Sequence, residues 1–203
     1  RAFISGGSIK LDPEIARVDL SLCDDCGECV KCPFDAISMN DHNNLTINPL
    51  VCNGCGYCTV LCDQKAISIA GYTEDQIRAE IGGVLEKGDL LAFLSRNIAY
   101  ATADNIGSSA ATYPANTKIV RVPTTTIVTE SMIKQAFGTG ARAVLMVEEP
   151  TDDPIGEFVY SLALDNFRKL KKELGDSGGR IYFKKAYIPN YRGLASTFTT
   201  RSE

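Results

Sequence analysis

The sequence reads CDDCGECVKCP at residues 23–33 and CNGCGYCTVLC at residues 52–62, and these two runs hold all eight cysteines of the 203-residue chain. In each run, three cysteines are separated by two residues, a spacing that lets three thiolates surround one small inorganic core. A fourth cysteine in each run, Cys32 or Cys62, can complete the set. Two such runs are the signature of two cubane [4Fe-4S] clusters, so the sequence predicts a chain that carries single electrons.

Disulfides and zinc are the other uses for so many cysteines. Disulfide frameworks are typical of short secreted domains, whereas dense thiols in a reducing cytosol bind metals, and triplets spaced this closely would make a poor disulfide framework. Two structural zinc sites are the alternative, although zinc usually takes separated pairs of cysteines, often with histidine. The one histidine, His42, lies in the polar link DHNN (41–44), where we expect it to be solvated.

Composition limits the functional classes. The chain is 44% hydrophobic and 23% charged, as in ordinary globular proteins, and no apolar run approaches the roughly 18 to 20 residues of a membrane span. With no signal peptide visible, we expect a cytoplasmic location, with any membrane association through partner subunits. Because the chain opens at Arg1 and not at Met, we also expect a fragment or a processed chain whose N-terminal part is missing.

The excess of acidic groups lies in the cysteine-rich part. Residues 1–72 contain five Lys or Arg and nine Asp or Glu, a net charge of −4, whereas residues 73–203 contain sixteen of each. An acidic surface suits docking to a basic redox partner and would repel nucleic acid. The basic run at residues 168–172 is interpreted as a solvated helix face.

The cysteine-rich part is an internal repeat, because VDLSLCDDCGECVKCPFDAISM (18–39) matches INPLVCNGCGYCTVLCDQKAISI (47–69). Each copy is predicted to form a short strand, a ligand loop, a one-turn helix and a second short strand. One copy is too small to bury a core, but two copies around two clusters can be stable because metal binding is coupled to folding. We therefore expect an α+β bicluster ferredoxin-like domain at residues 18–72.

A different pattern follows the repeat. Thr73-Glu74-Asp75-Gln76 is a capping box, and the apolar residues after it predict a connecting helix at residues 73–88 that Gly88 ends. Residues 89–203 alternate between apolar runs and helical patterns, which favours an α/β domain with a mostly parallel sheet. The tail after Pro189 is ambiguous and could contain a short helix. Strands are predicted at residues 90–94, 118–122, 143–147 and 181–187, and helices at about 99–110, 130–137 and 155–174.

In ferredoxins with these motifs, the fourth cysteine of each run binds the other cluster. The sequence departs from the usual pattern in two places, since only two residues separate Cys29 from Cys32, and Asp63 replaces the proline expected after Cys62. The shorter loop could strain the Cys32 contact or leave its cluster near solvent. By the ferredoxin rule, one cluster is held by Cys23, Cys26, Cys29 and Cys62, and the other by Cys52, Cys55, Cys58 and Cys32.

The segments around the cysteines resemble one known arrangement. RAFISGGSIKLDPEIARVDLSLC (1–23) resembles the exit from the flavin domain of the heterodisulfide reductase A-type subunit, and AISIAGYTEDQIRAEI (66–81) resembles the stretch after the ferredoxin insert of that family. Residues 89–190 resemble the delta subunit of methyl-viologen-reducing hydrogenase, and the B subunit of the quinone-interacting membrane-bound oxidoreductase complex is similar in layout. The resemblance implies that residues 1–17 leave an upstream flavin domain, which would hold FAD outside this chain.

Delta subunits of this kind normally bind a two-iron cluster through cysteines, and those cysteines are missing here. Ser95 and Ile98 occupy two of the ligand places, and Thr124 stands where another cysteine is expected. Glu149 and Pro154 lie near the final pair. Because serine, threonine and glutamate are poor substitutes for thiolate, we expect no third cluster. The resemblance then makes residues 89–203 a degenerate module kept for docking or structure.

The resemblance implies a relay of electrons. Its partners would be a flavoprotein domain or subunit on one side, and other iron–sulfur or membrane-bound redox subunits on the other. The distal substrate would be a heterodisulfide or a quinone, and the missing two-iron site favours the quinone-linked complex. The alternatives are a free ferredoxin-type carrier with an appended docking domain, and a non-redox interaction module with structural metal sites. The carboxylate pairs at 148–149 and 152–153 are interpreted as loop charges, so catalysis on any substrate is assigned to other subunits or to the missing part.

Overall fold

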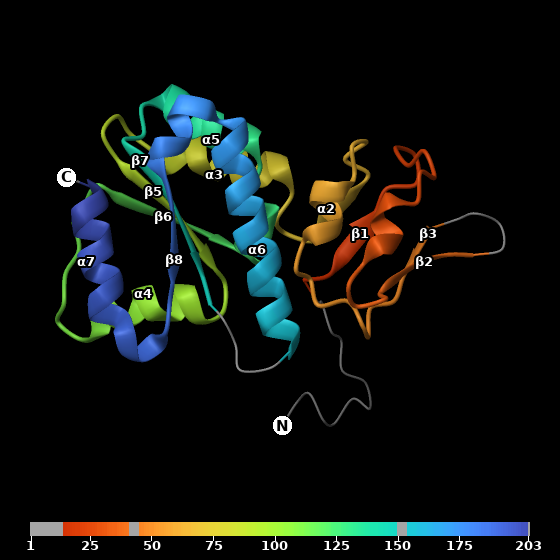
Figure 1. Cartoon of the computed structure of the whole chain (residues 1–203), viewed down its shortest axis with the longest axis horizontal. Helices are drawn as coiled ribbons and strands as arrows, with labels where there is room; N and C mark the ends of the chain where they lie inside the picture. The colour runs from red at the N-terminus through yellow and green to blue at the C-terminus, as the bar shows by residue number, and fades with distance from the viewer. Residues whose placement is uncertain (1–13, 41–44, 150–153, 203) are drawn as a thin grey trace, which may run out of the picture.

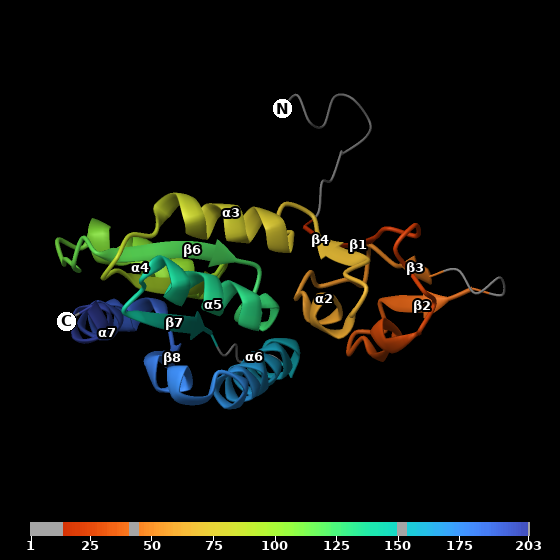
Figure 2. The same ribbon diagram turned by 90° about the horizontal axis from the view of Figure 1, so that it is seen from above.

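The structure is a computed structural model and describes residues 14–40, 45–149 and 154–202. A small cysteine-rich domain and a larger α/β domain lie side by side (Figure 1), as the view from above also shows (Figure 2). His42 and most of the predicted exit segment at residues 1–17 lie outside the described residues. Within the described ranges, no helix has both the length and the apolar character needed to cross a bilayer.

The cysteine-rich domain consists of two antiparallel strand pairs that interleave the two sequence repeats. Strand β1 (Ala16–Val18), before the first cysteine run, pairs with β4 (Ile67–Ile69), after the second. Strand β2 (Ile37–Met39), after the first run, pairs with β3 (Leu45–Ile47), before the second. The ends of the two runs lie on a 3-10 helix, η1 (Glu28–Lys31), and on a short helix, α2 (Tyr57–Leu61).

This domain has a small core of its own. Ile37, Ile67 and Ile69 are buried, and the cysteines Cys29 and Cys58 pack among them. Each repeat therefore forms the predicted strand, loop, short helix and strand, which confirms the repeat. The assignment as a bicluster ferredoxin-like domain stays a prediction.

The α/β domain contains one four-stranded parallel sheet. Its strands, in spatial order, are β6 (Thr117–Val122), β5 (Leu90–Ser95), β7 (Ala143–Glu148) and β8 (Ile181–Lys185). All three pairings are parallel, as the sequence predicts. The central strands β5 and β7 are buried along their whole length, which explains why their sequences are continuous apolar runs without alternation.

Helices cover both faces of this sheet (Figure 1). On one face pack α3 (Glu74–Val84), α5 (Glu130–Thr139) and α6 (Pro154–Glu173), and on the other α4 (Ile98–Ser108) and α7 (Tyr191–Ser202). The three predicted helices of this domain correspond to α4, α5 and α6, and the ambiguous tail forms α7. The remaining 3-10 helices are η2 (Thr125–Ile127), η3 (Gly175–Arg180) and η4 (Ile188–Asn190).

The connecting helix is shorter than predicted and forms part of the α/β core. The Thr73 hydroxyl accepts a hydrogen bond from the Gln76 N–H at 3.2 Å, and the Gln76 side chain accepts one from the Thr73 N–H at 3.0 Å, so the capping box is confirmed. Helix α3 ends at Val84, before Gly88. Its buried Ile77 and Ile81 pack among side chains of β5, β6 and α5, so the helix is fixed against the sheet.

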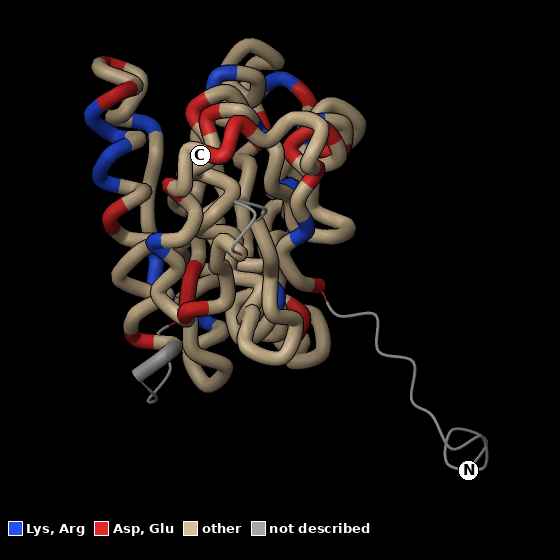
Figure 3. Tube along the Cα trace, turned by 90° about the vertical axis from the view of Figure 1, so that its right-hand side faces the viewer, with Lys and Arg blue, Asp and Glu red and all other residues tan. Residues whose placement is uncertain are grey.

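Figure 3 shows the molecule from the side of the cysteine-rich domain, with the basic positions of α6 along one edge. In this run, Arg168, Lys169, Lys171 and Lys172 are exposed, whereas Leu170 is buried against the sheet. The prediction of a solvated helix face is therefore confirmed. The acidic excess of the chain lies instead in the cysteine-rich part, which faces the viewer in Figure 3.

Replacing the fully buried Ile81 by alanine is expected to destabilise the α/β domain by about 2 to 5 kcal/mol, because the truncation leaves a cavity in the core. Val84→Ala, in the same helix but 38% exposed, is the matched control and should cost less than about 1 kcal/mol. Urea unfolding followed by circular dichroism measures both changes. Equal effects would show that α3 does not pack on the sheet.

Candidate metal centres

The eight cysteines are free thiols that line two separate cavities, four in each. The space free of protein atoms is about 330 Å³ at the first cavity and about 300 Å³ at the second, with space open to solvent included. Apolar groups complete the walls, such as Leu45 and Ile67 in the first cavity and Ile37 and Ile69 in the second. The first cavity is lined by Cys23, Cys26, Cys29 and Cys62, and the second by Cys32, Cys52, Cys55 and Cys58.

The last cysteine of each run lies in the cavity of the other run. Cys32 follows η1 and lines the second cavity, whereas Cys62 follows α2 and lines the first. The strand pairs β1–β4 and β2–β3 produce this exchange, because each joins the beginning of one repeat to the end of the other. These are the two sets that the ferredoxin rule groups, and their role as ligands stays a prediction.

Two glycines allow the second cysteine loop to approach its neighbours closely. Gly54 and Gly56 have positive φ angles of 62° and 81°. A Cβ at Gly54 would lie 2.1 Å from the Glu14 carbonyl oxygen, and one at Gly56 would lie 1.8 Å from Cγ2 of Ile127. A larger residue at either position would need both a strained backbone and a displaced neighbour. The second loop is therefore packed tightly against η2 of the α/β domain.

Backbone amides contact two of the thiols, and burial acts on two others. The Ala66 N–H donates to Cys62 Sγ at 3.3 Å, and the Ala16 N–H donates to Cys52 Sγ at 3.5 Å. Burial raises the pKa of Cys55 to about 11 and also raises the pKa of Cys58. These two thiols keep their protons near neutral pH. A metal core would have to displace these protons on binding.

The cavities fit the donor set of an iron–sulfur cluster. Each offers four sulfur atoms around one mostly apolar space, which is the ligand set of a [4Fe-4S] cluster. In the part of the chain that the structure describes, no three or more His, Cys, Asp or Glu side chains are grouped as they would be around a single metal ion.

The second cysteine loop is joined to the α/β domain by polar contacts as well as by packing. The Thr124 hydroxyl donates to the Cys55 carbonyl oxygen at 2.6 Å. Arg96, which follows β5, forms an ion pair with Glu14, which precedes β1. In the first run, by contrast, Cys26 is exposed to solvent. The two cavities thus have different surroundings, although their sequences are repeats.

The positions that correspond to the missing two-iron cluster lie together at the carboxyl ends of the strands. Ser95 ends β5, Thr124 follows β6 and Glu149 follows β7. The Ser95 hydroxyl donates a hydrogen bond to the Glu149 carboxylate. Ile98 begins α4, and Pro154 begins α6 with its side chain outside the described part. This edge of the sheet therefore holds a polar network at the positions where the resemblance leads us to expect thiols.

The interpretation of Glu148 and Glu149 as loop charges is wrong. Their exposed fractions are 2% and 7%, and both carboxylates accept hydrogen bonds. Glu148 accepts from the Thr125 N–H at 2.6 Å and from the Thr125 hydroxyl at 2.8 Å, and Glu149 also accepts from the Ala99 N–H at 3.2 Å. Burial and the neighbouring Glu149 raise the pKa of Glu148 to about 7. Their place at the carboxyl end of a buried parallel strand is the signal that could have identified them.

Residues 90–203, more than half of the chain, match the family model of the delta subunit of methyl-viologen-reducing hydrogenase. The chain belongs to this family. The matched residues of the delta-subunit family contain the whole parallel sheet and all of its covering helices except α3. This match confirms the resemblance noted for residues 89–190.

The chain is also similar to the A-type subunits of heterodisulfide reductases. It is 53% identical over 200 residues to the A-type subunit of the Ferredoxin:CoB-CoM heterodisulfide reductase of Methanosarcina acetivorans, and this match covers 98% of the chain and 25% of that protein. The Methanosarcina mazei protein of the same name is 29% identical over 177 residues, which are 83% of the chain and 22% of that protein. The chain thus spans about a quarter of the length of these curated relatives.

The pKa of Glu148 predicts a pH-dependent stability. Because the pKa rises from 4.5 to about 7 in the fold, the folded state binds this proton more tightly, and stability should fall as pH rises from about 5 to 8. The loss should reach at most about 3 kcal/mol, and Glu148→Gln should abolish most of it. Urea unfolding at several pH values measures the slope, with the exposed Glu157→Gln as control. A slope that is unchanged in Glu148→Gln would contradict the assignment.

Proposed function

We propose that this chain is the electron-transfer segment of a flavin-linked, heterodisulfide-reductase-like oxidoreductase complex. In this proposal, two [4Fe-4S] clusters occupy the two cavities that the eight thiols line. The observation that carries the proposal is the division of the free thiols into two sets of four, each lining one cavity. The first cluster would be held by Cys23, Cys26, Cys29 and Cys62, and the second by Cys52, Cys55, Cys58 and Cys32.

The clusters, when bound, would each accept and release one electron. The chain would contribute the surroundings that make this transfer useful. Leu45 and Ile69 would keep water from the two cavities, and the Ala66 and Ala16 amides would stabilise negative charge on the sulfur atoms of Cys62 and Cys52. Because both sites share one small core, an electron could pass from one to the other within the domain.

The names of the relatives support the wider role. Both are named as the A-type subunit of a Ferredoxin:CoB-CoM heterodisulfide reductase. We therefore propose a heterodisulfide as the distal substrate and keep the quinone-linked complex as the second candidate. FAD and substrate catalysis would belong to other parts of the complex. The partners would be a flavoprotein domain or subunit, together with further iron–sulfur or membrane-bound redox subunits.

Metal analysis tests the cluster proposal. Anaerobically purified protein should contain about eight irons and as many acid-labile sulfides, and Cys23→Ser or Cys52→Ser should each remove about half of them, because each cluster needs four thiolates. Electron transfer from reduced flavoprotein through the chain should stop in both variants. Asn53→Ser, beside Cys52 but without a thiol, is the control and should keep both clusters. Zinc without iron would instead support the non-redox interaction module.

The exchange of the last cysteines makes a sharper prediction. Cys62→Ser should alter the same electron paramagnetic resonance signal as Cys23→Ser, and Cys32→Ser should alter the same signal as Cys52→Ser, because each pair lines one cavity. Partial reduction at a series of potentials would separate the two signals. If Cys62→Ser and Cys52→Ser changed one and the same signal, each run would hold its own cluster and the proposed ligand sets would be wrong.

A further inference from the structure

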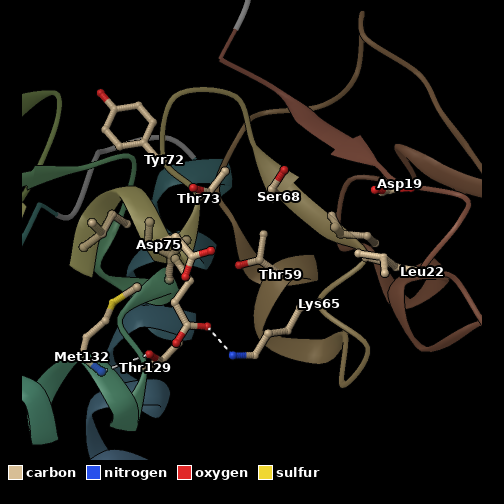
Figure 4. Close-up of a pocket in the computed structure, with 15 residues that line it drawn as sticks. Asp19, Leu22, Thr59, Lys65, Ser68, Tyr72, Thr73, Asp75, Thr129 and Met132 are labelled. Carbon is tan, nitrogen blue, oxygen red and sulfur yellow. Dashed lines mark hydrogen bonds and ion pairs between the residues drawn. The ribbon is translucent and has the colours of Figure 1, made fainter. Parts of the chain in front are cut away.

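A groove separates the cysteine-rich domain from the α/β domain on the side of β4 and α3. It encloses about 950 Å³, including space open to solvent. Figure 4 shows Asp19 and Leu22 on one wall and Asp75, Thr129 and Met132 on the other. The groove is distinct from the two cysteine cavities and from the buried carboxylates at the carboxyl edge of the sheet, so neither of those sites explains it.

The groove and the first cysteine cavity share a wall. Ala66 and Ile67 line both spaces, so the groove lies on one side of this segment and the first cavity on the other. Ala66 also connects them by hydrogen bonds, since its N–H donates to Cys62 Sγ at 3.3 Å and its carbonyl oxygen accepts from the Asp19 N–H at 2.8 Å. A molecule seated in the groove would therefore be separated from the thiols of the first cavity by a single layer of backbone.

The charges of the groove are unbalanced. Lys65 is the one cation among its lining residues, and its ammonium group lies 3.0 Å from the Glu74 carboxylate. Glu74 also accepts a hydrogen bond from the Ser131 hydroxyl of α5, so this ion pair is part of the domain junction. Asp19 and Asp75 are exposed on opposite walls, and among the described residues neither forms an ion pair. The groove thus presents two negative charges to a binding partner.

An apolar side chain lies beside these carboxylates. Leu22 is 53% exposed at the groove wall, one residue before Cys23, and Leu20 nearby is 56% exposed. Apolar groups surrounded by charges of one sign are typical of transient docking surfaces, because the charges steer the encounter while the apolar contact stabilises it. The chemistry of the walls therefore fits a protein surface that carries lysine or arginine around an apolar tip.

We propose that this groove is the docking site of a separate, basic redox protein that exchanges electrons with the chain at the first cysteine cavity. The proposal rests on the proposed function, because it needs a cluster in that cavity. One electron moves between the cluster and the redox centre of the partner, and no bond is formed or broken. The second cavity, packed on the α/β domain through Thr124 and Ile127, would then be the inner site of the relay.

Cytochrome c, a basic one-electron acceptor, serves as the probe. Its reduction by the reduced, cluster-loaded chain is followed by stopped flow over a range of ionic strengths. Asp19→Asn combined with Asp75→Asn should lower the second-order rate constant about three- to tenfold at low salt, because rim charges act mainly on the association rate. The difference should vanish toward about 1 M salt, where the screening length is near 3 Å. Asparagine at position 19 keeps the oxygen that Ser21 contacts.

The control is a pair with the same change of charge far from the groove, Asp104→Asn in α4 combined with Asp176→Asn in η3. At about 0.1 M ionic strength, where the screening length is near 10 Å, this pair should stay within about twofold of the wild type, because neither residue lines the groove. Equal slowing by both pairs would show that the rate depends only on the net charge of the chain. This outcome would overturn the proposal. A wild-type dimer that the groove pair dissociates in analytical ultracentrifugation would overturn it as well, because the occupant would then be a second copy of the chain.

A small neutral quinone, offered to the same variants, separates a failure of the docking site from a failure of the proposed function. All variants should reduce it at the same rate, which shows that their clusters are intact and active. If the groove pair slowed this acceptor as much as cytochrome c, the substitutions would act on the cluster and not on docking, and the docking site would be wrong. If the wild type contained no iron, the proposed function itself would fail.

Discussion

The exchange of one cysteine between the two repeats is the constraint on which the rest of this molecule depends. Each repeat is too short to bury a core alone, and each places its last thiol in the cavity of the other. The strand pairs β1–β4 and β2–β3 impose the same reciprocity on the backbone. Neither half can therefore be complete without the other, and with the two proposed clusters the folding of the domain and the assembly of its centres would become one process.

The α/β domain supports this small core through contacts that its sequence does not predict. It fixes the second cysteine loop through the Thr124 hydroxyl and through Ile127, which lies where a side chain on Gly56 would be. At the same edge of the sheet, Ser95 and Glu149 form a buried hydrogen bond in the place of the thiols of the related arrangement. The α/β domain thus supports the cysteine-rich domain by direct contacts.

Much of the fold could be predicted because it depends on local patterns. Buried parallel strands such as β5 and β7 are continuous apolar runs, and the capping box at Thr73 marks the start of α3. The sequence could not show that α3 packs on the sheet, because the cap says nothing about the partner. The burial of Glu148 could not be predicted for a similar reason. The Thr125 N–H and hydroxyl that donate to its carboxylate come from a distant segment. Helix α7 is rich in threonine and serine, which are weak helix formers, and its burial of Phe198 against the sheet outweighs that propensity.

The tight fit between Gly56 and Ile127 has a consequence for the sensitivity of the protein to oxygen. Ile127 covers the second loop on the side of the α/β domain, so from that side dissolved oxygen would reach the thiols behind it only when the junction opens. Oxidative damage at that centre would then begin with a breathing motion of the two domains, and its rate would follow the free energy of opening the junction. Tolerance to oxygen would in this way be a property of hydrocarbon packing, and it could be changed by residues that never touch sulfur.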